Sequence, residues 1–247
     1  MNSTNRLYLD LSSYYDQFCS HVDYAEQCDF AFRAYKAFND AQLKQYYDLA
    51  CGTGQHLQNL AQHGFNVTGL DNSQDMLDQA QQRCPEASLV CCDLAQFENQ
   101  QEFDLITCFL YSMHYSQPSS CFIETLKRAY SALVPGGIFL FDMVDKDGIK
   151  NDAGVAHQIQ DGEDSLSFQS RWHYTGEGDK LDLHLSISLN QQTWDDHHTM
   201  TAVNISQVQN WMTEIGFELT ILERNFSCFK EWDGNSANVM IIGKRIA

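Results

Sequence analysis

The feature that most constrains the fold is a regular alternation of strand-like and helix-like segments that begins at Gln45. The run "QYYDLA" is typical of a buried strand, and residues 55–63 follow it with Leu57, Leu60 and Ala61 at helical spacing. Further strands are expected at 65–70, 87–92, 103–110 and 138–144, with a second helix at 73–83. Segments that alternate in this order predict a parallel sheet with helices on both of its faces.

Three regions extend this core. Residues 8–38 look helical and precede the first strand. Residues 166–202 change to a period of two, which predicts two or three antiparallel strands inserted after the fifth core strand. A helix at 205–215 then leads to two closing strands at 217–223 and 238–244, arranged as a hairpin at the sheet edge. The expected fold class is α/β: a Rossmann-like, seven-stranded, mostly parallel sheet with helices on both faces, an N-terminal helical segment and an antiparallel β insertion after strand 5.

The charge balance excludes several classes of partner. The chain has 15 Lys and Arg against 33 Asp and Glu, a net charge of −18, whereas a nucleic-acid binder needs cationic surface. No stretch approaches the roughly 18 apolar residues of a membrane span, and residues 1–10 lack the pattern of a secretory signal. The nine cysteines include no CxxC pair. We therefore expect a cytoplasmic protein with reduced thiols that binds neither nucleic acid nor membrane, and whose acidity serves either a small or cationic ligand or solubility alone.

A glycine-rich loop follows the first predicted strand, in the stretch "DLACGTGQHL". Gly52 and Gly54 permit tight turns and the close approach of a ligand, but Leu57 stands where a dinucleotide-binding loop has its third glycine. Asp71 ends the second strand, where a carboxylate can accept hydrogen bonds from both hydroxyls of a ribose. Asp93 ends the third strand, within reach of an adenine amino group. This pattern predicts a ligand that contains a nucleoside but no pyrophosphate.

Residues 45–144 resemble the core of class I S-adenosylmethionine-dependent methyltransferases. The run Asp48–Gly54, the acids Asp71 and Asp93, and "ALVPGGIFLF" through the fifth strand carry this resemblance. The stretches "YYDQFCSHVDYAEQCDF", "GLDNSQDMLDQA" and "CPEASLVCCDLAQF" are similar to small-molecule N-methyltransferases that dimethylate nucleotide-linked amino sugars, and to glycine and sarcosine methyltransferases. The resemblance implies S-adenosylmethionine as cofactor and in-line transfer of its methyl group to a small-molecule acceptor. An amine of an amino sugar or an amino-acid-like compound ranks first as that acceptor.

The same resemblance implies a set of cofactor-binding residues. Asp48 holds the ammonium group of the methionine moiety, directly or through water. Tyr15 and Tyr24 either place an aromatic face against the sulfonium cation or pack the N-terminal lid onto the core. The complete set is Tyr15, Tyr24, Asp48, Ala50, Gly52, Gly54, Asp71, Asn72, Met76, Asp93, Leu94 and Phe109.

Acceptor chemistry is expected after strands 4 and 5, in "FLYSMHYS" and "FDMVD". His114 titrates near neutrality and ranks first as general base, and Tyr115 ranks second, the alternative for both being a loop residue bonded to backbone. The candidate acceptor-binding residues are Tyr111, Asp142, Trp172 and His198. Their alternatives are a helix cap for Asp142 and an apolar face packed on the core or a second subunit for the insertion residues. His197 and His198 point to opposite faces of a strand, so no metal site is expected.

A single domain is expected over 1–247, divided into a helical lid (1–44), a cofactor-binding core (45–150), an antiparallel insertion (151–203) and closing elements (204–247). The insertion is also the candidate surface for a homodimer. Two alternatives to the N-methyltransferase remain open at this point. One is an O- or C-methyltransferase of a hydroxylated or quinone-like metabolite. The other is a protein that binds S-adenosylmethionine without catalysis or serves as an interaction module.

Overall fold

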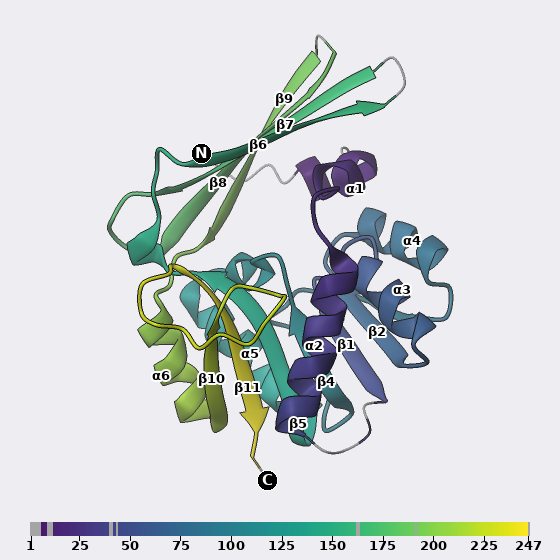
Figure 1. The fold of residues 1–247 in the computed structure, drawn as a ribbon, viewed down its shortest axis with the longest axis vertical. Coiled ribbons are helices and arrows are strands. Elements are labelled where there is room, and N and C mark those ends of the chain that lie inside the picture. Colours follow the sequence, from purple (N-terminus) through teal and green to yellow (C-terminus); the bar gives the residue numbers. More distant parts are fainter. Residues whose placement is uncertain are drawn as a thin grey trace.

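The strands expected from Gln45 onward form one seven-stranded sheet in the order β10-β11-β5-β4-β1-β2-β3 (Figure 1). The computed structural model describes residues 6–8, 12–39, 42, 44–161, 164–190 and 192–246. The strands of this sheet are β1 (Gln45–Leu49), β2 (Asn66–Asp71), β3 (Ser88–Cys91), β4 (Phe103–Cys108), β5 (Leu133–Val144), β10 (Phe217–Glu223) and β11 (Asn238–Arg245). Pairing is parallel from β3 through β5, whereas β11 pairs antiparallel with both β5 and β10. The expected fold class, with its closing hairpin, is confirmed.

Helices cover both faces of this sheet. They are α2 (Tyr24–Phe38), α3 (Gln55–Gln62), α4 (Gln74–Arg83), α5 (Ser119–Ala132) and α6 (Ile205–Ile215). Along β5 the side chains alternate between the faces: Phe139 and Phe141 pack with α5 and α6, whereas Ile138 and Leu140 pack with α2 and α3. Because both faces are covered, β5 reads as a continuous apolar run rather than an alternating one.

The insertion forms a second, antiparallel sheet in the order β6-β7-β8-β9. Its strands are β6 (Gly154–Asp161), β7 (Asp164–Tyr174), β8 (Lys180–Leu189) and β9 (Gln192–Thr201). It therefore has four strands, one more than the sequence pattern predicts. The additional strand β6 lies at the edge and is largely exposed, so its sequence lacks the alternation that a half-buried strand requires. Figure 1 shows this sheet extending from one end of the core, with α1 (Tyr15–Phe18) beneath it.

The N-terminal segment, which the sequence predicts to be helical over 8–38, forms several separate elements. It contains three short elements, η1 (Arg6–Tyr8), η2 (Ser12–Tyr14) and α1, before α2 begins. The break is set by Asp23, whose carboxylate accepts a hydrogen bond from the backbone nitrogen of Glu26 and caps a new helix. Leu7 is fully buried against Leu166 and Phe168 of the insertion. The segment therefore links the four-stranded sheet to the core.

The remaining short elements are η3 (Ser112–Tyr115), which follows β4, and η4 (Lys146–Gly148), which follows β5. Among the described residues, no helix combines the length and apolarity that a membrane crossing requires.

Candidate active site

The glycine-rich loop turns sharply between β1 and α3. Gly52 and Gly54 have φ angles of 52° and 81°, in the left-handed region that favours glycine. A side chain at Gly54 would also begin 3.0 Å from the Cβ atom of Ala80 on α4. Gly54 precedes the first turn of α3, so the loop presents backbone nitrogens at a helix N-terminus. One side of the loop thus packs closely against α4, and the other side leaves its backbone accessible to a ligand.

The carboxylate of Asp71 fixes this loop to the end of β2. Its Oδ2 atom accepts a hydrogen bond from the backbone nitrogen of Gly52 at 2.9 Å, and its Oδ1 atom accepts one from that of Ser73 at 2.9 Å. Burial raises the pKa of Asp71 to about 6, although both backbone hydrogen bonds act to lower it. Two backbone donors leave part of the acceptor capacity of a carboxylate unused.

Asp48, at the end of β1, has one oxygen satisfied and one not. Its Oδ1 atom accepts a hydrogen bond from the hydroxyl of Thr107 at 2.9 Å. Its Oδ2 atom is buried without a hydrogen bond within the described ranges, and lies 3.4 Å from Nδ1 of His56. A buried carboxylate oxygen without a donor is costly unless a cationic or hydrogen-bonding group joins it. Asp48 therefore fits the role of a ligand for an ammonium group.

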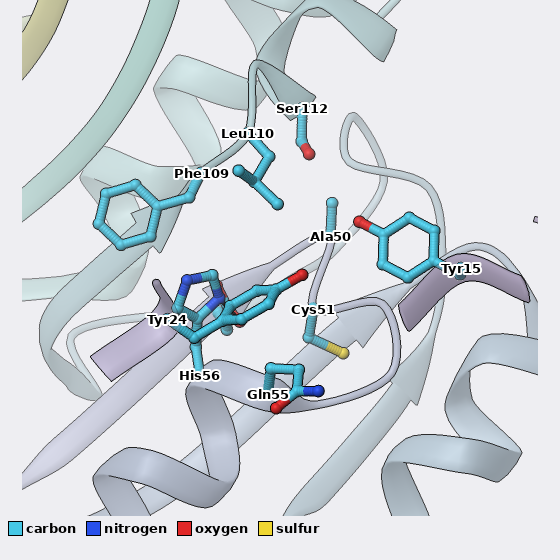
Figure 2. Close-up of a pocket in the computed structure, with 10 residues that line it drawn as sticks. Tyr15, Tyr24, Ala50, Cys51, Gln55, His56, Phe109, Leu110 and Ser112 are labelled. Carbon is cyan, nitrogen blue, oxygen red and sulfur yellow. Dashed lines mark ion pairs between the residues drawn. The ribbon is translucent and has the colours of Figure 1, made fainter. Parts of the chain in front are cut away.

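A small cavity of about 20 Å³ lies beside this carboxylate. Its lining residues are Tyr15, Tyr24, Asp48, Ala50, Cys51, Gln55, His56, Phe109, Leu110 and Ser112. Figure 2 shows the hydroxyls of Tyr15 and Tyr24 pointing into the same space next to Ala50. The Tyr24 hydroxyl is buried beside the thiol of Cys19, with no hydrogen-bond partner in the described part of the chain. Five of the twelve expected cofactor residues thus meet here: Tyr15, Tyr24, Asp48, Ala50 and Phe109.

The cavity is small because the N-terminal segment covers the loop. The ring of Tyr15 lies over Gly52, with Cε1 3.6 Å from the position a Cβ atom would take there. The backbone carbonyl of Tyr8 accepts a hydrogen bond from the hydroxyl of Ser73 at 2.5 Å. Ligand pockets span about 300–1,000 Å³, so this cavity is far smaller than a nucleoside requires. The structure is a closed state in which tyrosines stand over the loop.

The other expected cofactor residues lie along the same edge of the sheet. Asp93 follows β3, and its Oδ1 atom accepts a hydrogen bond from the backbone nitrogen of Ala95 at 2.8 Å. Met76 and Leu94 are buried, whereas Asn72 is exposed. The edge therefore offers, in order, acidic groups at the ends of β1, β2 and β3 with apolar side chains between them.

His114 is placed differently from its expected role. Its ring is fully buried, and Nδ1 lies 2.8 Å from the backbone carbonyl of Thr201. Its Nε2 atom accepts a hydrogen bond from the backbone nitrogen of Val144 at 3.1 Å. Burial lowers the pKa of His114, and the two backbone partners fix the neutral ring with its proton on Nδ1. Both nitrogens are used to join β9 to β5, so this geometry favours a structural role over that of a base.

Tyr115, the second candidate base, has side-chain partners instead. Its hydroxyl lies 2.5 Å from Nδ1 of His198 and 2.9 Å from the hydroxyl of Tyr8. The Nε2 atom of His198 lies 2.8 Å from Oδ2 of Asp196. Burial raises the pKa of Tyr115 well above its usual value, so its hydroxyl is protonated. Tyr115 and His198, predicted for separate roles, are thus brought into one hydrogen-bonded group.

The other expected acceptor residues adjoin this group. Tyr111 packs against Trp172 with ring centroids 5.7 Å apart. Asp142 is fully buried; its Oδ1 atom accepts a hydrogen bond from the backbone nitrogen of Tyr111 at 3.0 Å, and its Oδ2 atom one from Nε of Arg224 at 2.6 Å. Its carboxylate is therefore engaged within the protein, which favours a structural role for Asp142.

Several residues of the site were not expected from the sequence. His56 and Gln55 follow the glycine loop directly, and their position after "CGTG" was the available signal. Asp196 lies two residues before His198, on the same face of β9, which a strict reading of the strand period would have indicated. Arg224 begins a long loop and carries no local pattern. No group of three or more possible metal ligands occurs among the described residues.

Comparisons with known proteins agree with this geometry. Residues 47–137 match a family described as a methyltransferase domain. A protein of Geobacillus sp. (strain WCH70) named as a methyltransferase is 28% identical over 242 residues, covering 87% of this chain and 90% of that protein. The dTDP-3-amino-3,4,6-trideoxy-alpha-D-glucopyranose N,N-dimethyltransferase of Streptomyces venezuelae is 24% identical over 184 residues, covering 66% and 76% of the two chains.

A solved structure is also similar. The S-adenosylmethionine-bound structure of CalS10, an amino pentose methyltransferase from Micromonospora echinaspora, superposes with a TM-score of 0.78 at 16% identity, covering 94% of this chain and 96% of that one. The fold, the domain match and the acidic edge of the sheet together define the class. The chain is a methyltransferase that uses S-adenosylmethionine.

Proposed function

We propose that this protein transfers the methyl group of S-adenosylmethionine to an amine nitrogen of a small molecule, either an amino sugar or an amino-acid-like compound. One observation carries the proposal: Tyr15 and Tyr24 line the cavity beside Asp48, and Tyr8 packs between Tyr15 and Tyr115, so that aromatic rings extend from this cavity to the acceptor side. Aromatic faces and a carboxylate suit a sulfonium and an ammonium group better than a neutral phenol. The relative from Streptomyces venezuelae, which is named as an N,N-dimethyltransferase of an amino sugar, supports the same choice.

The proposed cofactor contacts follow the sheet edge. Asp48 binds the ammonium group of the methionine moiety through its Oδ2 atom, which has no hydrogen bond within the described residues. Asp71 accepts the ribose hydroxyls with its unused acceptor capacity, and Asp93 accepts the adenine amino group with the oxygen that Ala95 does not occupy. Gly52 and Gly54 allow the backbone to approach the ligand. The apolar side chains Met76, Leu94 and Phe109 cover the base and the methionine chain, with Asn72 at the solvent rim.

The cofactor supplies a methyl carbon already activated by a sulfonium group. The protein's tasks are therefore to align the acceptor nitrogen, exclude water and remove a proton when the amine arrives as ammonium. Tyr111 and Trp172 form an aromatic wall on the acceptor side, and Tyr115 presents the hydroxyl that contacts the reacting nitrogen. His114 holds the end of β9 against β5 and so sets the position of this wall.

Release of S-adenosylhomocysteine against two pooled libraries tests the proposal, one of small amines and one of small hydroxyl and phenol compounds. We expect turnover in the amine pool alone. Turnover only with hydroxyl or phenol compounds would establish an O- or C-methyltransferase instead. Thermal stabilisation by the cofactor with no turnover in either pool would favour a non-catalytic binding protein and contradict the proposal.

Two further parts of the proposal concern the surroundings of the protein. The edge strand β6 exposes Val155, whose side chain is 60% accessible, and we infer that it pairs with a second copy of the chain to form a homodimer. Sedimentation velocity tests this, and a monomer at micromolar concentration contradicts it.

All nine cysteines are free thiols, which supports a cytoplasmic location.

A further inference from the structure

An acidic and a basic side chain of the insertion, Asp196 and His198, point toward the core. Asp196 and His198 lie two residues apart on β9, so they share one face of the strand, and their side chains are about 1% and 0% exposed. They belong to the four-stranded sheet, whereas Tyr115 belongs to the seven-stranded core. The hydrogen bond of 2.5 Å between His198 and Tyr115 therefore joins the two sheets at the acceptor side of the site.

The carboxylate defines which nitrogen of His198 carries the proton. Asp196 lies 2.8 Å from Nε2, so the carboxylate favours the tautomer with the proton on that nitrogen, in which Nδ1 carries the lone pair. The lone pair faces the hydroxyl of Tyr115, which donates to it. A neutral imidazole aimed at a hydroxyl in this way can receive a proton, and the buried carboxylate behind it stabilises the resulting cation.

We propose that His198 is the proton acceptor for the methyl-transfer reaction, reached through the hydroxyl of Tyr115 and positioned by Asp196. The proposal rests on the amine acceptor of the proposed function. An N–H bond of the acceptor's ammonium group breaks, its electron pair stays on nitrogen, and its proton moves to the oxygen of Tyr115. The proton of Tyr115 passes to Nδ1 of His198, and the imidazolium pairs with Asp196. The freed lone pair attacks the methyl carbon as the carbon–sulfur bond breaks toward sulfur.

The N-terminal segment marks where the acceptor nitrogen sits. The hydroxyl of Tyr8 lies 2.9 Å from that of Tyr115, in the closed state, and so occupies the hydrogen-bonding position that an acceptor N–H needs. The backbone nitrogen of Leu7 donates to Oδ2 of Asp196 at 2.7 Å, the same oxygen that holds His198. Leu7 therefore adds a donor that keeps the carboxylate oriented while the segment is closed.

Three titratable side chains of the described residues lie against His198. Asp196 faces it from its own strand, Tyr115 from η3 and Tyr8 from η1, with ring centroids of Tyr8 and His198 5.0 Å apart. Farther out, Cys19 acts on both tyrosines and Asp71 on Tyr8. Burial raises the pKa of both tyrosines, so they remain neutral donors through the physiological range. Asp196 is thus the anionic group in direct contact with the imidazole.

A pH profile of kcat/KM tests the proposal, with His198→Asn and Tyr115→Phe as the test variants. His197→Asn is the matched control, because its side chain points to the opposite face of β9, near Asp182. We expect both test variants to lose roughly 10²–10⁴-fold near neutral pH and the control to lose little. The loss of kcat/KM in the two test variants should become smaller as pH rises toward the pKa of the amine, because the free amine needs no base. A deficit that is constant with pH, or no deficit, would overturn the proposal.

A measurement on the protein without substrate separates this inference from the choice of acceptor. In nitrogen NMR of ¹⁵N-histidine-labelled protein, His198 of the wild type should show a protonated Nε2 and a hydrogen-bonded, unprotonated Nδ1. Tyr115→Phe keeps the imidazole in place and should move the Nδ1 resonance of His198 while leaving that of His197 unchanged. An Nδ1-protonated ring, or an unmoved resonance, would contradict the relay. With these resonances as expected, an inactive amine pool would contradict only the proposed function.

Discussion

The carboxylate of Asp71 accepts a hydrogen bond from the backbone nitrogen of Gly52, 19 residues earlier, at a distance of 2.9 Å. The same side chain thus shapes the glycine loop and faces the proposed ribose position. Asp71→Ala should weaken cofactor binding by about 2–3 kcal/mol, the scale of hydrogen bonds to a charged group. Isothermal titration calorimetry checks this, with Asp75→Ala on the exposed side of α4 as control. An affinity equal to that of the wild type would remove Asp71 from the cofactor site.

The raised pKa of Asp71 predicts that cofactor affinity depends on pH. Ribose hydroxyls donate to the ionised carboxylate, which predominates only above the pKa of about 6. Below pH 6 binding must also displace a proton, so the dissociation constant should fall about tenfold per pH unit as pH rises toward 6, and then level off. Titrations from pH 5 to pH 8 measure this. The Asp71→Asn variant should lack the dependence, and a flat wild-type profile would contradict the assignment.

The same pKa also predicts how stability changes with pH. The folded protein holds the Asp71 proton up to about pH 6, whereas the unfolded chain releases it near 3.8. The unfolded state therefore binds fewer protons between these values, and the free energy of unfolding should fall by about 2 kcal/mol as pH rises from 4 to 6. Urea unfolding of wild type and Asp71→Asn across this range isolates the contribution. Equal slopes for the two proteins would show that Asp71 is not responsible.

The hydrogen bonds of His114 predict a loss of stability rather than of chemistry. His114→Phe leaves the carbonyl of Thr201 and the nitrogen of Val144 without partners, at about 1–3 kcal/mol for each buried group. We expect a lower melting temperature, with turnover of the folded fraction close to that of the wild type. A variant of normal stability that has lost roughly 10²-fold or more in turnover would restore His114 as the base.

The ion pair between Arg224 and Asp142 predicts a second structural effect. Arg224→Met removes the partner of a fully buried carboxylate and should cost about 3–5 kcal/mol. The double variant with Asp142→Asn should recover part of this loss, because the uncompensated charge is then absent. Chemical denaturation of the single and double variants measures the coupling. Strictly additive effects would mean that the pair does not act as a unit.

The core was predictable because its signals are local. Strand β10 and helix α6 occur at the residues that their period and turn signals predict, and Ser73 caps α4 as expected, accepting a hydrogen bond from the nitrogen of Met76. Strand β6 was missed because an exposed edge strand needs no apolar face. The division of the N-terminal segment before α2 was not predictable, because it depends on the cap that Asp23 provides and on contacts of α1 with both the insertion and the glycine loop.

The site residues that lie at the end of a strand were predictable. Asp48, Asp71 and Asp93 each end or follow a parallel strand, so topology alone places them on one edge. The partners of His198 were not predictable, because the contact with Tyr115 spans 83 residues. It depends on how the second sheet packs against the first. For His114 the observed geometry matches the alternative of a residue bonded to backbone, but its backbone partners in β9 and β5 lie far away in the sequence and could not be predicted.

The N-terminal segment is tied at Ser73 on one side and at Asp196 on the other, across the mouth of the site. While both ties hold, the cavity beside the loop is about 20 Å³, which is too small for the cofactor, so the segment must move before S-adenosylmethionine binds. Each methyl group delivered requires one exchange of S-adenosylhomocysteine for fresh cofactor, and therefore at least one opening of the segment. The opening rate is thus an upper limit on turnover, and an acceptor methylated twice waits for that gate twice.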